Sequence, residues 1–375
     1  MTQPPARKIP ILIASTLKPI RDIRAFGKLA FSLGETNTYE LNIIGFSPKK
    51  PQPQPGIRFF SSMGNFYSRV DRILSQARFL KCLLQVRPKI LVCCTYELLP
   101  LASLLKPILG FSLVYDVQEN YLTNLDLNPS LSPTAKSRSS QVIRRAEAVP
   151  NVDLFLMAEK CYIKEMPGKR PFLVLENKFR GEINKVGPLN YHRKTGFQFC
   201  ITGTITPSFG TWEAMAWLRE ILKAYPLSSL EIIGHCPLPG YGAKLAQLAK
   251  ALPQVKLRLS PNPIAHEELM EALAKADFAL LPYHLHPAIS GKMPTKLYEC
   301  AAMGIPVLVS PNSLWDDFLS SFAGGYSIDF SDPTLALGQF QSALTRTYFS
   351  SPPPESLLWK SQSAHLQKAF TKLLA

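Results

Sequence analysis

The chain has 375 residues, of which 46% are hydrophobic and 18% charged, a composition that excludes general disorder. This length exceeds what one hydrophobic core usually organises, and it favours two domains. Lys and Arg outnumber Asp and Glu by 42 to 27, and residues 1–195 alone contain 29 basic and 14 acidic side chains. Such an asymmetry indicates an anionic partner for the first half, or a basic surface without a partner.

The N-terminal half alternates short apolar runs with amphipathic stretches, the pattern of a parallel sheet covered by helices. Strands are predicted at residues 10–15, 40–46, 89–94, 112–117, 153–158 and 172–177, and helices at 21–33 and 68–85. The most apolar region, residues 89–117, contains charged residues and prolines, so it is a poor membrane span and a good strand-helix-strand unit.

The apolar periodicity stops at residues 181–196, where Gly, Pro, Asn and basic residues predominate, and it then restarts. Further strands are predicted at 197–203, 230–234, 256–260, 278–283 and 306–310, with helices at 211–225, 243–252 and 266–276. We therefore expect an α/β protein of two Rossmann-like domains facing a cleft. The expected parts are residues 1–185, a linker at 186–196, a second domain at 197–350, and a C-terminal helix within 351–375 that packs back on the first domain.

Cysteine usage favours a cytoplasmic protein. The seven cysteines show no CxxC pair and mostly lie in apolar runs: Cys82, Cys93, Cys94, Cys161, Cys200, Cys236 and Cys300. They are typical of reduced core residues. The apolar run at residues 11–14 is too short for the hydrophobic part of a signal peptide.

Two glycine-containing loops follow predicted strands of the second half, where parallel sheets bind ligands. The first, GTITPSFGTWEA from Gly203, precedes a helix whose free N–H groups suit a phosphate, although a plain strand-to-helix turn explains it equally well. It has neither the dinucleotide nor the Walker A spacing. The second begins at Gly234, and His235 beside it is more simply an incidental loop histidine.

The segment after the strand at 278–283 carries most of the polar chemistry. His284 and His286 have the residue type of metal ligands, but no third ligand follows at helix spacing. Lys296 and Glu299 share one helix face and could simply pair. Because the following segment is apolar, however, this carboxylate needs a strong partner, and a ribose diol or a diphosphate would match the pair.

These residues carry a family resemblance. The segment PTKLYECAAMGIPV (294–307) resembles P-x-K-x-x-E-x-x-A-x-G-x-P-V, the signature of family-4 (group 1) glycosyltransferases, which have the GT-B fold. LEIIG (230–234), residues 266–283 and the late Trp359 also resemble their counterparts, so the whole C-terminal half is covered. In the first half, residues 15–33 and YDVQENY (115–121) are similar but less specific.

The resemblance implies a hexosyltransferase-type enzyme that moves a sugar from a nucleotide sugar with retention of configuration. It implies a glycan or lipid-linked acceptor, in cell-surface polysaccharide or glycolipid synthesis, with neither a bound metal nor a separate cofactor. The sequence agrees in one respect, because no Asp-x-Asp triplet occurs in it.

The resemblance also assigns residues. Glu299 matches the residue that holds the donor ribose, Lys296 the basic position of the signature, and Gly203 and Thr204 the loop near the donor phosphates. The expected nucleotide-sugar-binding set is Gly203, Thr204, Gly234, Ser290, Gly291, Lys292, Lys296 and Glu299. Gly291 stands where many members have a second glutamate. The first glycine loop lacks the usual Arg and Lys, so Lys292 and Lys296 would supply that charge.

In the first half, Asp116 and Glu119 match the acidic pair that faces the cleft. We expect one of them to orient or deprotonate the acceptor, or to support sugar hydroxyls. The alternative is a helix-capping Asp with a solvated Glu.

The basic first half suggests docking on an anionic membrane surface, which makes the protein peripheral at the inner membrane face. The residues expected there are Lys18, Arg21, Arg24, Lys28, Arg69, Arg72, Arg78 and Lys81, with Phe66, Tyr67, Ile73 and Leu74. The segment at 132–148 is expected to be a mobile acceptor loop or a further basic contact. Nucleic acid is not expected, because no stacking platform or reading helix is evident. A non-catalytic protein of the same fold and a sugar-nucleotide epimerase remain alternatives.

Overall fold

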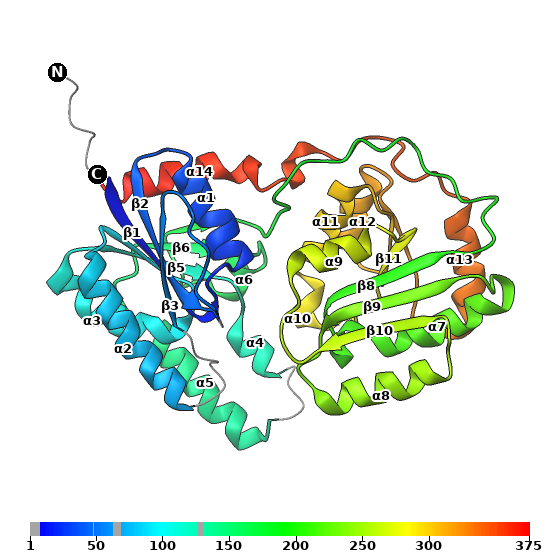
Figure 1. Ribbon diagram of the computed structural model, residues 1–375, viewed down its shortest axis with the longest axis horizontal. Coiled ribbons are helices and arrows are strands. Elements are labelled where there is room, and N and C mark those ends of the chain that lie inside the picture. Colours follow the sequence, from blue (N-terminus) through cyan, green and yellow to red (C-terminus); the bar gives the residue numbers. More distant parts are fainter. Residues whose placement is uncertain (1–7, 48, 63–68, 127–130) are drawn as a thin grey trace. The chain divides into compact units, whose positions relative to one another are not determined.

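The computed structural model describes residues 8–47, 49–62, 69–126 and 131–375. The chain divides into two compact units, shown in Figure 1. Unit 1 comprises Met1–Arg180 together with Trp359–Ala375, and unit 2 comprises Gly181–Leu358. The last helix of the chain, α14 (Lys360–Lys372), therefore belongs to the unit that the chain forms first.

Unit 1 is built on a seven-stranded parallel sheet of strand order β3-β2-β1-β4-β5-β6-β7. Its strands are β1 (Ile9–Pro19), β2 (Tyr39–Phe46), β3 (Ile57–Ser62), β4 (Ile90–Cys93), β5 (Ser112–Val117), β6 (Leu154–Met157) and β7 (Phe172–Val174). Six of them were predicted from the sequence, and β3 was not.

The alternation of side chains along β1 sends apolar residues to two cores. Ile11 and Ile13 pack with Trp359 and Phe370, so the π-helical segment η1 (Ile23–Ala30), α1 (Phe31–Gly34) and α14 cover one face. Leu12 belongs to the other core, under α2 (Arg69–Val86) and α3 (Leu99–Leu109) (Figure 1). The remaining α-helices are α4 (Tyr121–Asp126), α5 (Pro133–Glu147) and α6 (Tyr162–Glu165), with the 3₁₀ turn η2 (Tyr96–Leu98) before α3.

Unit 2 has a six-stranded parallel sheet of order β10-β9-β8-β11-β12-β13. Its strands are β8 (Gln198–Thr204), β9 (Ser229–His235), β10 (Val255–Ser260), β11 (Phe278–Leu281), β12 (Val307–Val309) and β13 (Gly325–Ser327). Its α-helices are α7 (Thr211–Ala224), α8 (Pro239–Lys250), α9 (His266–Leu273), α10 (Pro287–Ser290), α11 (Thr295–Met303), α12 (Ser313–Ser320) and α13 (Ala336–Leu344). Its 3₁₀ turns are η3 (Pro207–Phe209), η4 (Pro333–Leu335) and η5 (Glu355–Leu357).

The strand orders confirm the expected fold class, an α/β protein with two parallel sheets. In unit 2 the strand order reverses between β8 and β11, so the loops that leave their carboxyl ends run in opposite directions. A sheet of this kind binds ligands at that point. β8 ends at Thr204, and the segment after β11 leads to α11, so the two segments singled out by sequence border this switch point.

Among the helices in the described part of the chain, none is both long and apolar enough to cross a bilayer. The same residues contain no group of three or more His, Cys, Asp or Glu side chains that could hold a metal ion.

Candidate functional site

Glu299 of α11 is the centre of a buried polar cluster in unit 2. Its Oε2 accepts a hydrogen bond from Lys296 Nζ at 2.6 Å, and its Oε1 accepts one from His266 Nε2 at 2.9 Å. The Glu299 side chain is only 5% exposed, against 15% for Lys296 and 28% for His266. The pair on one helix face is therefore not a solvated surface pair. It is a buried carboxylate reached from outside through two basic side chains.

The pKa of Glu299 shows the balance of forces in this cluster. Burial by itself would raise that pKa, but the charge of Lys296 and the hydrogen bonds from His266 and Lys296 lower it from 4.5 to about 2. The carboxylate is consequently ionised at neutral pH, and it can act only as a hydrogen-bond acceptor.

Glycines at the ends of β8 and β9 bring the backbone close to this cluster. Gly203 has a φ of +112°, and a Cβ placed on it would lie 3.5 Å from Lys296 Cε. A Cβ on Gly234 would lie 2.0 Å from the Gly203 carbonyl oxygen, so the neighbouring strand also requires glycine. Thr204, which is exposed, lines a small cavity together with Lys296. The structure thus places Gly203, Gly234, Thr204, Lys296 and Glu299 near one another.

The segment between β11 and α11 is anchored through its backbone. The Ser290 carbonyl accepts a hydrogen bond from Asn312 Nδ2 at 3.0 Å, and the Lys292 carbonyl accepts one from Trp315 Nε1 at 2.8 Å. Gly291 between them is exposed, with a φ of −86° that any residue adopts. Its lack of a side chain is therefore no backbone requirement.

Sequence reasoning gave no role to the contact of His284 with Glu213. His284 Nε2 lies 3.0 Å from Glu213 Oε1, which joins the segment after β11 to the first turn of α7. His266 was missed as a site residue altogether, because it precedes Glu299 by 33 positions and starts a different helix.

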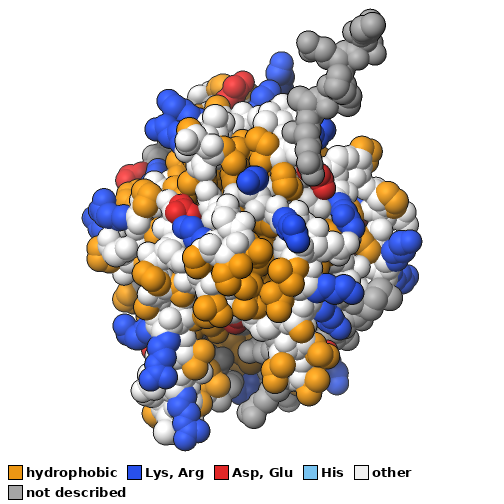
Figure 2. Space-filling view, turned by 90° about the vertical axis from the view of Figure 1, so that its left-hand side faces the viewer, with side chains coloured by type: hydrophobic (Ala, Val, Ile, Leu, Met, Phe, Trp, Pro, Cys, Tyr) orange, Lys and Arg blue, Asp and Glu red, His pale blue; other side chains and the backbone are white. Residues whose placement is uncertain are grey.

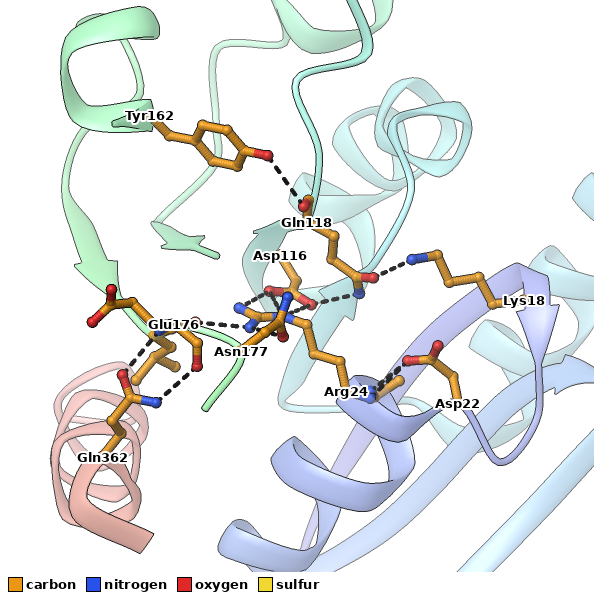
Figure 3. Close-up of polar contacts among 11 residues, drawn as sticks. Lys18, Asp22, Arg24, Asp116, Gln118, Tyr162, Glu176, Asn177 and Gln362 are labelled. Carbon is orange, nitrogen blue, oxygen red and sulfur yellow. Dashed lines mark hydrogen bonds and ion pairs between the residues drawn. The ribbon is translucent and has the colours of Figure 1, made fainter. Parts of the chain in front are cut away.

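Unit 1 also holds a buried carboxylate at the carboxyl end of its sheet, shown in Figure 3. Asp116 on β5 is 0% exposed. Arg24 Nε lies 2.9 and 3.0 Å from its two oxygens, and Arg24 Nη2 lies 2.7 Å from Oδ1. Gln118 Nε2 donates to Oδ2 at 2.7 Å, and Lys18 donates to the Gln118 amide oxygen. Every Asp116 oxygen is thus engaged within the protein.

Arg24 ties Asp116 to the strand end beyond β7. Its Nη1 donates to the Leu175 carbonyl at 2.7 Å and to Asn177 Oδ1 at 2.9 Å (Figure 3). Burial alone would lower the pKa of the Arg24 guanidinium, but the adjacent Asp116 carboxylate raises it above its usual value. Asp22 accepts from the Arg24 and Ala25 N–H groups at 3.0 and 2.8 Å, which fixes the start of η1.

Glu119 is not drawn into this cluster. It is exposed, and its Oε2 accepts from Asn124 Nδ2 at 2.7 Å. The idea of Asp116 as a helix cap is wrong, because Asp116 lies inside β5, and Asn120 instead accepts from the Thr123 N–H at 3.3 Å. The structure therefore places Asp116 and Glu119 in different environments, one buried and one exposed.

Two expectations for the basic surface need correction, and a third falls on residues that the structure does not describe. Arg24 and Lys28 are buried, 4% and 3% exposed, so they are not surface cations. Residues 133–147 of the expected loop form helix α5, capped by Ser132. Phe66, Tyr67 and the side chains of Arg69 and Arg72 lie outside the described residues.

No protein-family model and no curated protein matches the chain. Solved structures do. Sucrose-phosphate synthase from Thermosynechococcus elongatus is 12% identical, with a TM-score of 0.71 over 98% of this chain and 99% of its own. The catalytic domain of starch synthase IV from Arabidopsis thaliana, bound to ADP and acarbose, is 11% identical, with a TM-score of 0.65 over 98% of this chain and 99% of its own. HepE from Anabaena, in complex with UDP-glucose, is 11% identical, with a TM-score of 0.63 over 97% of this chain and 100% of its own. At this identity the likeness shows the architecture, and the chain has the GT-B fold shared by these glycosyltransferases.

Proposed function

We propose that the protein is a glycosyltransferase whose unit 2 binds a nucleotide sugar at the carboxyl edge of its sheet. The observation that carries this proposal is the buried Lys296–Glu299 pair, held against Gly203 beside the switch point between β8 and β11. An ionised carboxylate suits the two hydroxyls of a ribose, and an ammonium suits a diphosphate. Similar solved structures hold UDP-glucose in one case and ADP in another.

In this proposal, different site residues bind different parts of the nucleotide-sugar donor. Glu299 takes the ribose and Lys296 the diphosphate, while the absent side chain of Gly203 lets the phosphates approach the backbone. Lys296 then stabilises the negative charge that develops on the departing diphosphate, which is usually the largest contribution to such a reaction. Lys292 adds charge, and Ser290 and Gly291 border the sugar. We also propose that the reaction retains the anomeric configuration and needs no metal, because the family resemblance implies both properties.

Asp116 and Glu119 of unit 1 receive different roles in the proposal. Asp116 has no free oxygen for an acceptor, so it supports the strand ends through Arg24 and Gln118. Glu119 is exposed and one hydrogen bond from Asn124 holds it, so it is the better candidate to contact an acceptor hydroxyl.

The proposed acceptor is a glycan or a lipid-linked molecule at an anionic membrane surface, where the protein would bind peripherally from the cytoplasm. Apolar residues of α2 recur at 70, 73, 77, 80 and 84, and Ile73 is 72% exposed. Ile108 of α3 is 74% exposed. Figure 2 shows hydrophobic side chains on one side of the molecule with Lys and Arg around them. Unit 1 carries 29 basic against 13 acidic residues, which complements an anionic surface.

Calorimetry with UDP, ADP, GDP and their glucose conjugates tests the donor assignment. We expect one base to bind, and Glu299→Ala to weaken that binding about tenfold or more, because the ribose loses a charged acceptor. Glu220→Ala, at a half-buried residue of α7 that pairs with Lys223, serves as the control. Absence of binding by all six compounds would show that the protein is no nucleotide-sugar enzyme.

Two alternative functions would give different results in activity assays. A sugar-nucleotide epimerase would convert the donor without an acceptor, whereas a transferase needs the acceptor for net transfer. A non-catalytic protein of this fold, which Gly291 and the uncharged loop after Gly203 favour, would bind the nucleotide and turn over no donor.

A further inference from the structure

His266 is the second partner of the buried carboxylate, and it comes from a separate helix. Glu299 Oε1 receives His266 Nε2 at 2.9 Å, while Oε2 receives Lys296 from the same helix as Glu299 itself. Because an ionised carboxylate accepts and never donates, Nε2 must carry the proton in this contact. The two oxygens of Glu299 are thus fixed by donors from α9 and α11 independently.

We propose that His266 is a positioning residue that holds Glu299 in place for the ribose of a nucleotide while Lys296 leaves Glu299 for the diphosphate. This inference rests on the proposed function, because it concerns the same donor. It assigns to the site a residue outside the signature segment at 294–307.

The need for a second donor follows from burial. A buried carboxylate that loses its only partner is strongly destabilised. If Lys296 were the sole partner of Glu299, its transfer to a phosphate would leave the carboxylate alone at 5% exposure. His266 removes that penalty, since it keeps one oxygen engaged and leaves the lone pairs of the other oxygen to the ribose.

The surroundings of both donors fit this division of labour. Lys296 Cε faces Gly203, where no Cβ blocks its path along the end of β8. His266 is less free, since it is the first residue of α9, and that helix is packed on the sheet through Leu269 and Leu273. In this proposal the Lys296 ammonium moves to the diphosphate, and the His266 imidazole stays on Glu299.

Substitutions at His266 separate a positioning role from a structural one. His266→Gln can place its amide nitrogen near the position of Nε2 and keep the donor, whereas His266→Asn is polar but too short to reach. His266→Leu removes the donor altogether. Each variant is measured by calorimetry against UDP, ADP and GDP, their 2′-deoxy counterparts, and pyrophosphate, with circular dichroism to confirm folding.

For the nucleotide that binds the unmodified protein, we expect a preference for the ribose form over the 2′-deoxy form. His266→Leu and His266→Asn should each reduce affinity for the ribose form about tenfold and abolish that preference, because a displaced Glu299 no longer binds the 2′-hydroxyl. His266→Gln should retain most of it. Pyrophosphate affinity should stay unchanged in all three variants and fall in Lys296→Ala.

Several results would overturn the inference. An unchanged ribose preference in folded His266→Leu or His266→Asn removes the role of His266 while leaving the proposed function intact. An equal loss of pyrophosphate affinity in these variants shows a merely structural residue. If His266→Leu and His266→Asn do not fold, a His266→Gln protein without ribose preference counts against the inference. Absence of binding by every nucleotide to the unmodified protein overturns the proposed function and this inference together.

Discussion

Each unit places a buried carboxylate beside a basic side chain near the carboxyl end of a parallel sheet. The two pairs differ in how completely protein donors enclose the carboxylate. Asp116 is fully enclosed, and Arg24 and Gln118 engage both of its oxygens. Glu299 receives one donor on each oxygen, and both donor side chains are partly exposed. Two buried ion pairs at similar places in a fold can thus differ in accessibility: the Asp116 pair is closed off from solvent, whereas solvent reaches the donors of Glu299.

Asp116→Ala gives the largest expected effect, because it leaves the Arg24 guanidinium buried without its counter-charge. Loss of one partner of a buried pair costs about 3–5 kcal/mol of unfolding free energy. Urea denaturation followed by circular dichroism measures it. The control is Glu220→Ala, which breaks a pair with Lys223 on the exposed side of α7 and should cost about 0.5 kcal/mol or less. A loss of similar size in both variants would contradict the stabilising role of Asp116.

The pH dependence of the unfolding free energy should show how much the ionised Glu299 carboxylate stabilises the fold. Its pKa is lowered from 4.5 to about 2 in the folded protein, so the folded state favours the ionised form. The stabilisation is fully present above about pH 5, and it is lost as the pH falls from 4.5 towards 2; in total it is worth roughly 3 kcal/mol. Comparison of unfolding free energies for the unmodified protein and Glu299→Gln from pH 7 to 2 measures it.

In that comparison, the stability gap between the two proteins should shrink only in the acidic window. Glu119→Gln, which removes an exposed carboxylate, is the control. A gap that stays constant down to pH 2 would mean that the charge of Glu299 does not stabilise unit 2.

The difference in charge between the units predicts where a membrane would bind. Ile73→Ser combined with Leu84→Ser removes two exposed apolar side chains of α2. Binding to vesicles of phosphatidylcholine with one quarter phosphatidylglycerol, measured by co-sedimentation, should weaken about tenfold. Leu227→Ser, at a residue of unit 2 that is 77% exposed, is the matched control and should bind like the unmodified protein.

The outcome has two informative alternatives. Equal weakening by Leu227→Ser would show that exposed apolar residues act without regard to the unit. A dimer in analytical ultracentrifugation that the α2 double variant dissociates, with no vesicle binding, would make a second copy of this chain the occupant of that face.

The sheets could be predicted because buried parallel strands are continuous apolar runs, such as those of β4 and β12. The two edge strands were missed for physical reasons. β3 follows the proline-rich residues 51–55, which read as loop, and β13 has three residues, one of them Gly325. A strand this short is defined by pairing with β12 and carries no periodicity of its own.

The site was only partly predictable. Lys296 and Glu299 lie on one helix, so their spacing revealed the pair. Arg24 and Asp116 are 92 residues apart, and nothing local in the sequence joins them. Arg24 was therefore interpreted as a surface cation, although Asp116 holds it inside the fold. Partners such as His266 become visible only when tertiary structure brings separate helices together.

Gly291→Glu should give the smallest effect. It tests whether residue 291 lies close to the sugar of a bound nucleotide sugar. The backbone at Gly291 has a φ of −86°, which any residue adopts, and the residue is exposed. A carboxylate would offer an acceptor to sugar hydroxyls and repel the diphosphate slightly. We expect the ratio of affinities for the nucleotide sugar and the nucleoside diphosphate to rise a few-fold. Calorimetry on both ligands measures it, with Gly240→Glu on α8 as the control. An unchanged ratio would place the sugar away from residue 291 and leave Lys296 and Glu299 as a grip on the nucleotide alone.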